Sequence, residues 1–389
     1  MRIAFIFDGL DIGGIERVGI QYVRLLKEMG HEIDVYNLNP DRSELHEELI
    51  GLCTLFESKL PKCLIPESYI LVLKRWWWGK YLYPFLYLLS KLTLLLLLPF
   101  KRSHQKYDVA IAFAGHFNDL AFIKYGFIKY DKACCWLHGA LIDYLVLAYT
   151  FGDFYKDIKN LVVLSENGQC SALNACAYLK SELNIVKIAN PVDLSNKMPD
   201  EQTGNELTER FGNYLLMVGR LANDKDQRTL IEARRILEDQ YGLTPHVVFV
   251  GDGERREELE SLTKSLGLED FVHFEGSRTD VENYYSTAHI YVHSSPAEGL
   301  PTAIIEALGF SLPVVSTDSP PGVTEILGDD TFGLRCRVAD PNDMAARIAQ
   351  MLTDESLRTK YSSKAQLRAN DFSLDRAASS LNSLLEDLV

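Results

Sequence analysis

Two glutamates, Glu298 and Glu306, stand eight positions apart across a predicted strand-to-helix junction. The apolar run 289–293 predicts a buried strand, and the apolar spacing from Thr302 onward predicts a helix. Glu298 then lies in the loop after the strand, and Glu306 lies about one turn into the helix. The first N–H groups of a helix have no partner within it, so the turn between the glutamates forms an anion site. A phosphate there, with a carboxylate on either side to accept sugar hydroxyl hydrogen bonds, has the polarity of a nucleotide-sugar site.

Two cations, Arg220 and Lys225, follow the predicted strand 214–218 and precede a predicted helix. A diphosphate leaving group gains about one negative charge when its bond to the sugar breaks. Arginine offers a planar fork to phosphate oxygens, and lysine offers a point charge. With roughly half a charge from a helix amino terminus, these cations can balance the leaving group without a metal ion. Taken alone, such a pair is more often ordinary surface charge.

Adjacent glycines, Gly13 and Gly14, join the predicted strand 2–7 to the predicted helix 16–29. Glycine lets the backbone approach a ligand closely and adopt positive φ. The loop lacks the G-x-G-x-x-G spacing of dinucleotide-binding proteins, so a nicotinamide or flavin site loses its main support. Asp34, on the second predicted strand, is more simply a strand residue than a ribose-binding acid.

The string from Ser295 to Gly309 resembles the E-x7-E element of family 4 retaining glycosyltransferases, which have the GT-B fold. Further segments match that family's motifs in the same order. They are the G-G-x-E-R loop at 13–17, the N-P-V-D hinge at 190–193, the G-R-x4-K pattern at 219–225 and, more loosely, the stretch 318–326. One departure is Asp226 after Lys225, where the family commonly has glycine or asparagine. The resemblance spans nearly the whole chain and is strongest from 214 to 326.

The resemblance implies a role for each matching residue. Four of them are expected to act on the reacting bond, namely His138, Arg220, Lys225 and Glu298. The donor nucleotide sugar is expected to contact a second group, namely Gly13, Gly14, Gly219, Ser277, Arg278, Leu300, Pro301, Thr302 and Glu306.

Within these groups, Glu298 is expected to orient donor sugar hydroxyls and Glu306 to hold the ribose. Ser277 and Arg278 are candidates for contact with the nucleobase. His138 ends the predicted strand 133–138, and the resemblance places it beside the donor sugar and diphosphate, where it would orient the sugar and stabilise the transition state. A UDP-sugar is the favoured donor, although no residue distinguishes uracil from guanine.

We therefore expect a retaining glycosyltransferase that needs no metal or other cofactor. It would move a sugar from a nucleotide diphosphate to a glycan or polyprenyl-linked acceptor in capsule, exopolysaccharide or O-antigen synthesis. No carboxylate nucleophile is identifiable, and the family's preferred account is a same-face substitution in which the departing phosphate takes the acceptor proton. The alternatives are a nucleotide-sugar 2-epimerase on a GT-B scaffold, a non-catalytic nucleotide-sugar-binding subunit, and a transferase with a soluble acceptor.

Short Val- and Ile-rich runs alternate with helical patterns, which predicts parallel sheets covered by helices on both faces. The predicted strands are 2–7, 31–38, 107–114, 133–138, 160–164, 184–188, 214–218, 246–250, 271–274, 289–293 and 313–317. A polar stretch, 193–212, is the best linker candidate. We expect an α/β GT-B fold with two doubly wound Rossmann-like domains, 1–192 for the acceptor and 193–372 for the donor, facing across a cleft. The last segment, 373–389, is expected to be a helix that returns to the first domain.

The composition narrows the function further. The chain has 389 residues with 40 basic and 54 acidic side chains, and its net charge of −14 argues against a nucleic-acid partner. Its first residues do not have the pattern of a signal peptide. The seven cysteines show no C-x-x-C spacing, so we expect reduced thiols in a cytoplasmic protein and no zinc site.

The segment 68–107 reverses the acidic character of the chain. It contains seven Lys or Arg residues, no Asp or Glu, the triplet Trp76–Trp78 and a run of leucines. Pro84 and Pro99 bracket the apolar run, which is short for a membrane span. We expect an interfacial helix pair on the inner face of the cell membrane, with cations beside anionic lipid. The alternative is a buried helical hairpin inserted in the first domain.

Overall fold

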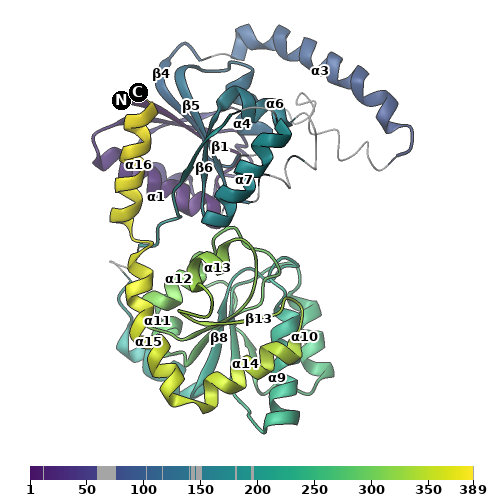
Figure 1. The fold of residues 1–389 in the computed structure, drawn as a ribbon, viewed down its shortest axis with the longest axis vertical. Coiled ribbons are helices and arrows are strands. Elements are labelled where there is room, and N and C mark those ends of the chain that lie inside the picture. The colour runs from purple at the N-terminus through teal and green to yellow at the C-terminus, as the bar shows by residue number, and fades with distance from the viewer. Residues whose placement is uncertain are drawn as a thin grey trace. The chain divides into compact units, whose positions relative to one another are not determined.

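The computed structural model describes residues 1–11, 13–58, 76–101, 103–115, 117–139, 141, 145, 151–179, 182–193 and 197–388. Residues 68–75 and 102 of the basic segment therefore lie outside the described residues. The chain divides into two compact units, each built on one parallel sheet (Figure 1). Unit 1 comprises Met1–Ala189 and Ala377–Val389, and unit 2 comprises Asn190–Arg376.

Unit 1 is built on a seven-stranded sheet with the order β3-β2-β1-β4-β5-β6-β7. The strands are β1 (Arg2–Phe7), β2 (Glu32–Asn37), β3 (Thr54–Glu57), β4 (Lys106–Ala112), β5 (Lys129–Leu137), β6 (Asn160–Val163) and β7 (Asn184–Lys187). The connecting helices are α1 (Gly14–Glu28), η1 (His46–Leu49), α3 (Gly79–Lys101), α4 (Phe117–Lys124), α6 (Phe151–Ile158) and α7 (Glu166–Leu179). The central strands are apolar on both faces because helices cover both, as the unbroken apolar runs predict.

Unit 2 is built on a six-stranded sheet with the order β10-β9-β8-β11-β12-β13. The strands are β8 (Tyr214–Val218), β9 (His246–Val250), β10 (Val272–Phe274), β11 (Ile290–His293), β12 (Val314–Thr317) and β13 (Leu334–Cys336). The helices are α8 (Glu201–Phe211), α9 (Gln227–Tyr241), α10 (Arg256–Ser265), α11 (Val281–Thr287), α12 (Thr302–Gly309), α13 (Gly322–Leu327), α14 (Pro341–Thr353) and α15 (Glu355–Asn370). Helix α16 (Leu374–Leu388) follows, and from Ala377 onward it groups with unit 1, as expected.

This architecture confirms the predicted fold class, two Rossmann-like parallel-sheet units. Two strands, β3 and β13, were not predicted, because each has only three or four residues and the half-buried β3 lacks a continuous apolar run. The described part of the segment 68–107 forms one helix, α3, which runs through Pro84 and Pro99. A proline removes one intrahelical hydrogen bond, and a long helix tolerates such a loss. None of the described helices is long and apolar enough to cross a membrane.

Two histidines on neighbouring strands make unit 2 sensitive to acid. The His246 Nδ1 and His273 Nε2 atoms lie 2.9 Å apart on stacked rings. Burial lowers the pKa of both imidazoles, and the charge of Arg234 lowers the pKa of His246 further. A His whose folded pKa is depressed favours the neutral form, so its protonation opposes folding.

We predict that the melting temperature of the chain falls as the pH is lowered from 7 through the ordinary histidine pKa of about 6.5. His273→Asn should flatten this dependence, because it removes one of the paired imidazoles. Differential scanning fluorimetry between pH 8 and pH 5 measures the effect, with the exposed His104→Gln as the matched control. Equal pH profiles for His273→Asn and wild type would contradict the assignment.

Candidate functional site

Each sheet has a topological switch point, where the chain leaves neighbouring strands toward opposite sides. Ligands of doubly wound sheets bind at this point, outside the carboxyl ends of the strands. In unit 2 it lies between β8 and β11, which pair in parallel. The segments 219–226 and 294–301 leave these two strand ends. They contain Arg220, Lys225 and Glu298, so the fold brings the predicted cations and one predicted glutamate to one place.

Glu298 is the centre of a buried ion cluster. Its Oε1 atom lies 2.6 Å from Lys225 Nζ and 3.1 Å from His293 Nε2. The Glu298 side chain is 12% exposed and that of His293 only 3%. Ser294 Oγ donates a hydrogen bond of 2.9 Å to the Lys225 carbonyl, which ties the loop after β8 to the end of β11. The cluster therefore locks together the two loops of the switch point.

The same contacts fix the charge of Glu298. Burial by itself raises its pKa, but the hydrogen bonds and charges of His293 and Lys225 together outweigh burial and lower the pKa to about 2. Glu298 is therefore ionised throughout the physiological pH range. An ionised carboxylate accepts hydrogen bonds and donates none, so it suits sugar hydroxyls as donors.

A third loop holds the backbone of Glu298 through hydrogen bonds. The Glu298 N–H donates to the Pro320 carbonyl at 3.3 Å, and the Gly322 N–H donates to the Glu298 carbonyl at 2.9 Å. A side chain at Gly322 would collide with the Gly299 carbonyl, so only glycine fits this close approach. The loosely matching motif at 318–326 thus holds the backbone on which Glu298 stands.

Arg220 reaches solvent from the same strand end. Its side chain is 65% exposed and its Nη2 atom lies 3.4 Å from Asp224 Oδ1. The arginine is thus accessible to a phosphate, and its backbone is held by Gln227 Nε2, which donates 2.8 Å to the Arg220 carbonyl. At neighbouring Gly219, the carbonyl packs against Gly251, where any side chain would collide with it.

Asp226 explains how the one departure from the family motif is accommodated. It adopts φ 47° and ψ 48°, the left-handed conformation, immediately before α9. Glycine and asparagine are the residues most at ease in this conformation, and aspartate is enriched there too. The backbone at Asp226 therefore has a conformation that glycine or asparagine also adopts readily.

Glu306 lies on α12 and pairs with a residue that the sequence analysis treated only as part of a linker. Lys197 Nζ lies 2.9 Å from Glu306 Oε1, and the two side chains are 31% and 23% exposed. Thr302 begins the helix, and Pro301 before it makes no side-chain capping bond. The amino end of α12 therefore retains the amide character that suits a phosphate.

The proposed base-contacting residues follow β10, at the edge of the sheet. Arg278 makes a bidentate pair with Asp280, with both N···O distances at 2.9 Å, and stands over the Tyr284 ring. Ser277 is exposed beside it. Arg278 is thus oriented by Asp280, and Ser277 presents backbone and hydroxyl groups to solvent.

Unit 1 carries the remaining predicted site residues after β1 and β5, the two strands that flank β4 beside the switch point of this sheet. Gly13 precedes α1, and a side chain there would collide with the Glu16 carboxylate, whereas a side chain on Gly14 would meet open space. His138 follows β5, and its Nε2 atom donates to the Phe113 carbonyl at 2.7 Å. This bond places a proton on Nε2.

The structure adds two residues that the sequence analysis did not assign to the site, His293 and Lys197. The sequence analysis treated His293 only as the last residue of a predicted strand. Its position at the carboxyl end of that strand was a signal that could have placed it in the site. Lys197 is 109 positions from its partner Glu306, and no local pattern indicates such a pair. Both hold a predicted glutamate in place.

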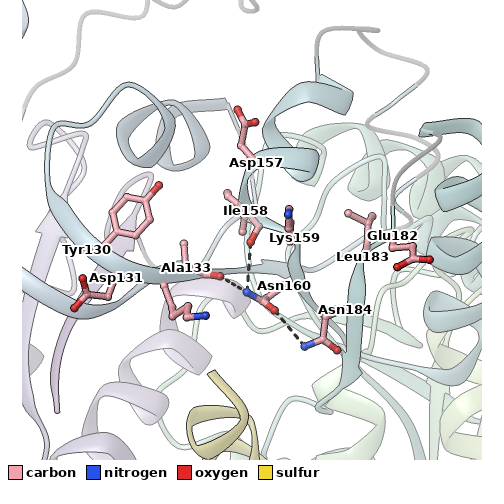
Figure 2. Close-up of a pocket in the computed structure, with 11 residues that line it drawn as sticks. Tyr130, Asp131, Ala133, Asp157, Ile158, Lys159, Asn160, Glu182, Leu183 and Asn184 are labelled. Atoms are coloured by element: carbon pink, nitrogen blue, oxygen red, sulfur yellow. Dashed lines mark hydrogen bonds between the residues drawn. The ribbon is translucent and has the colours of Figure 1, made fainter. Parts of the chain in front are cut away.

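A pocket of about 660 Å³ lies at the edge of the unit 1 sheet where its strands begin (Figure 2). It is lined by the amino ends of β5, β6 and β7, opposite to the carboxyl ends where His138 lies. Asn160 bridges these strands through bonds to the Ala133 carbonyl and Asn184. Acidic and basic side chains are mixed along the wall, and this pocket contains none of the predicted site residues.

We predict that Lys225→Met lowers the free energy of unfolding by about 2 kcal/mol at pH 7, because it leaves the Glu298 charge with His293 alone. Since the folded pKa of Glu298 lies below its ordinary value of 4.5, its contribution is complete above pH 4.5 and is lost toward pH 2. The deficit of the variant should therefore shrink as the pH falls below 4.5. Denaturant unfolding at each pH measures it.

Lys187→Met is the matched control, because the Lys187–Glu166 pair is exposed on unit 1. Loss of such a pair costs under about 1 kcal/mol. A Lys225→Met deficit that stays constant with pH would contradict the ion cluster.

Residues 201–368 match the family model described as glycosyl transferases group 1. An uncharacterized glycosyltransferase of Haemophilus influenzae is 31% identical over 50% of this chain and 52% of its own length. A Campylobacter jejuni enzyme, N-acetylgalactosamine-N,N'-diacetylbacillosaminyl-diphospho-undecaprenol 4-alpha-N-acetylgalactosaminyltransferase, is 34% identical over 47% of this chain and 48% of its own length. The chain thus spans about half the length of these two curated relatives.

Solved structures match over the whole chain. Anabaena HepE in complex with UDP and glucose has a TM-score of 0.72 at 19% identity, with all of both chains covered. Staphylococcus aureus TarM, in a complex that includes UDP, has a TM-score of 0.70 at 14% identity and 99% coverage of each chain. At this identity the likeness concerns the fold. Residues 201–368 therefore carry the sequence pattern of group 1 glycosyl transferases, within a chain that has the GT-B fold.

Proposed function

We propose that the chain is a retaining glycosyltransferase that transfers a sugar from a UDP-sugar to a glycan acceptor without a metal ion. The observation that carries this proposal is the buried cluster of Glu298, Lys225 and His293 at the switch point of unit 2. The match of residues 201–368 to group 1 glycosyl transferases supports the same activity.

The charge state of Glu298 limits the chemistry that it performs. A general acid or base works best when its pKa lies near the working pH. With a pKa of about 2, Glu298 has no proton to donate and is a weak base. Its role is to accept hydrogen bonds from the donor sugar and to stabilise positive charge that develops on the sugar ring. The acceptor proton then passes to the departing phosphate, which supports substitution on the same face of the ring.

The leaving diphosphate is stabilised by Arg220, Lys225 and the amide groups that begin α12. The Lys225 ammonium has three donors, so it can bind Glu298 and still bind a phosphate oxygen. Arg220 offers a fork that is open to solvent. In this account Glu306, held by Lys197, accepts from the ribose hydroxyls, and Gly219 lets the diphosphate approach the backbone.

UDP is the favoured nucleotide because HepE and TarM, which share this fold, were solved in complexes that contain UDP. Ser277 and the loop around Arg278 supply the base contacts. In unit 1, Gly13, Gly14 and His138 serve the sugar and diphosphate. None of these assignments requires a divalent cation, because side-chain cations and amides carry the positive charge.

A lipid-linked glycan is the proposed acceptor, and the inner face of the cell membrane the proposed location. Two Campylobacter jejuni relatives, at 34% and 32% identity, are named for the transfer of N-acetylgalactosamine to undecaprenol-linked glycans. Others are named for lipopolysaccharide core and amylovoran biosynthesis. The basic segment 68–107 supports the same location.

We predict that EDTA-treated protein transfers sugar from a UDP-sugar to an undecaprenyl-diphosphate glycan, and that the product keeps the anomeric configuration of the donor. Mass spectrometry and proton NMR of the product measure both.

Arg220→Ala should lower kcat/KM about 100-fold, the effect typical of losing one charged stabilising group. Glu298→Gln should lower kcat with little change in UDP affinity, because it contacts the sugar.

The outcomes separate the alternatives. Conversion of the nucleotide sugar to an isomer without an acceptor indicates a 2-epimerase, and an inverted product contradicts retention. UDP binding with no transfer to any glycan acceptor indicates a binding subunit. An activity that appears only after a divalent ion is added contradicts the role given to Arg220 and Lys225.

A further inference from the structure

Helix α3 has an apolar surface that the rest of the described chain does not cover. It is 23 residues long, or about 34 Å at the rise of an α-helix. Figure 1 shows it extending away from the sheet of unit 1. Exposed large apolar side chains run along one side of it, with exposed fractions from 50% at Leu89 to 73% at Leu96: Tyr81, Phe85, Leu88, Leu89, Leu92, Leu95 and Leu96. We call these seven residues the outer face of α3.

The opposite side of the same helix is held by the protein. Tyr83 and Leu94 are buried and belong to the hydrophobic cluster of unit 1. Ser90, between them, is buried too. These residues give the helix a buried side opposite its outer face, so the outer face is the side on which α3 can lie against a surface.

Three exposed tryptophans immediately precede α3 in the chain. Trp76, Trp77 and Trp78 are 47%, 83% and 40% exposed, and the rings of Trp76 and Trp78 stack 4.8 Å apart. Tryptophan combines a large apolar ring with a polar N–H group, and it is enriched where hydrocarbon meets lipid headgroups. Ordinary soluble proteins rarely expose an apolar patch of this extent.

The charge of α3 indicates which kind of surface binds its outer face. Helix α3 contains Lys80, Lys91 and Lys101 and no Asp or Glu, within a chain of net charge −14. The Lys91 ammonium stands 4.9 Å from the Tyr87 ring centre, so the helix holds a cation along its apolar length. Basic residues near an anionic bilayer contribute about 1 kcal/mol each. A second copy of α3 would bring lysines together with no carboxylate to pair with them, which disfavours a helix dimer.

We propose that the outer face of α3 and the Trp76–Trp78 triplet dock unit 1 on an anionic lipid bilayer, with the helix lying in the plane of the headgroup boundary. The apolar side chains enter the acyl boundary, and Lys91 meets lipid phosphates. Docking is reversible, because one interfacial helix binds far more weakly than a membrane span. This surface is separate from the donor-binding residues; it specifies how the membrane location given under the proposed function is reached, and it rests on that part of the proposal.

Vesicle binding of the full chain tests the proposal. We expect the protein to sediment with vesicles of phosphatidylglycerol and phosphatidylethanolamine, and at least tenfold less with phosphatidylcholine alone. Leu88→Glu/Leu92→Glu should lower the binding to anionic vesicles at least tenfold. Both leucines are more than 50% exposed, so the change leaves the core intact. Leu173→Glu/Leu367→Glu is the matched control with the same exchanges at exposed leucines elsewhere, and it should bind like wild type.

Tryptophan fluorescence gives an independent readout, because the four tryptophans are the triplet and the fully buried Trp136. Anionic vesicles should shift the emission of the triplet to shorter wavelength, and the shift should be lost in Leu88→Glu/Leu92→Glu. Equal binding of this variant and wild type, or no binding of wild type, overturns the proposal. A wild-type dimer that the variant dissociates, without vesicle binding, assigns the face to a second copy instead. UDP affinity in vesicle-free buffer should be equal in both proteins, which separates this test from that of the transfer reaction.

Discussion

A buried carboxylate that must stay ionised is the constraint on which the site of unit 2 depends. Moving a charge out of water is costly unless it is paired, so Glu298 requires both His293 and Lys225. These partners come from the two strand ends at the switch point, and the loop at Pro320 and Gly322 closes over the Glu298 backbone. The cluster therefore joins three separate loops into one rigid wall at the carboxyl edge of the sheet.

The same pairing assigns each charge a task. Held at low pKa, Glu298 can accept hydrogen bonds but cannot move a proton at neutral pH. The Lys197–Glu306 pair repeats the carboxylate–ammonium contact of Glu298 and Lys225, with Glu306 on α12. Both Glu298 and Glu306 therefore lie beside an ammonium group. A negatively charged phosphate that binds here thus meets carboxylates whose charge is already neutralised by lysines. Arg220 adds positive charge at the exposed rim.

The sequence predicted the strand-loop-helix order well, because short continuous Val- and Ile-rich runs are typical of buried strands in a helix-covered sheet. That order placed Arg220, Lys225 and Glu298 in loops after strand ends, and the structure shows that the two strands are neighbours. It did not indicate the partners. The Lys197–Glu306 pair depends on a distant backbone path, and the Arg278–Asp280 pair on a loop conformation. Helix α3 runs through Pro84 and Pro99, because helix breaking is a local tendency that neighbouring turns can override.

Phosphorus NMR of UDP tests the central claim, that side-chain cations and amides hold the diphosphate without a divalent ion. UDP would be titrated into protein prepared in EDTA, and both of its phosphorus resonances would be followed. The account predicts that both resonances shift and broaden as the complex forms, and that added Mg²⁺ changes little. Resonances that stay at their free positions until Mg²⁺ is added would contradict it.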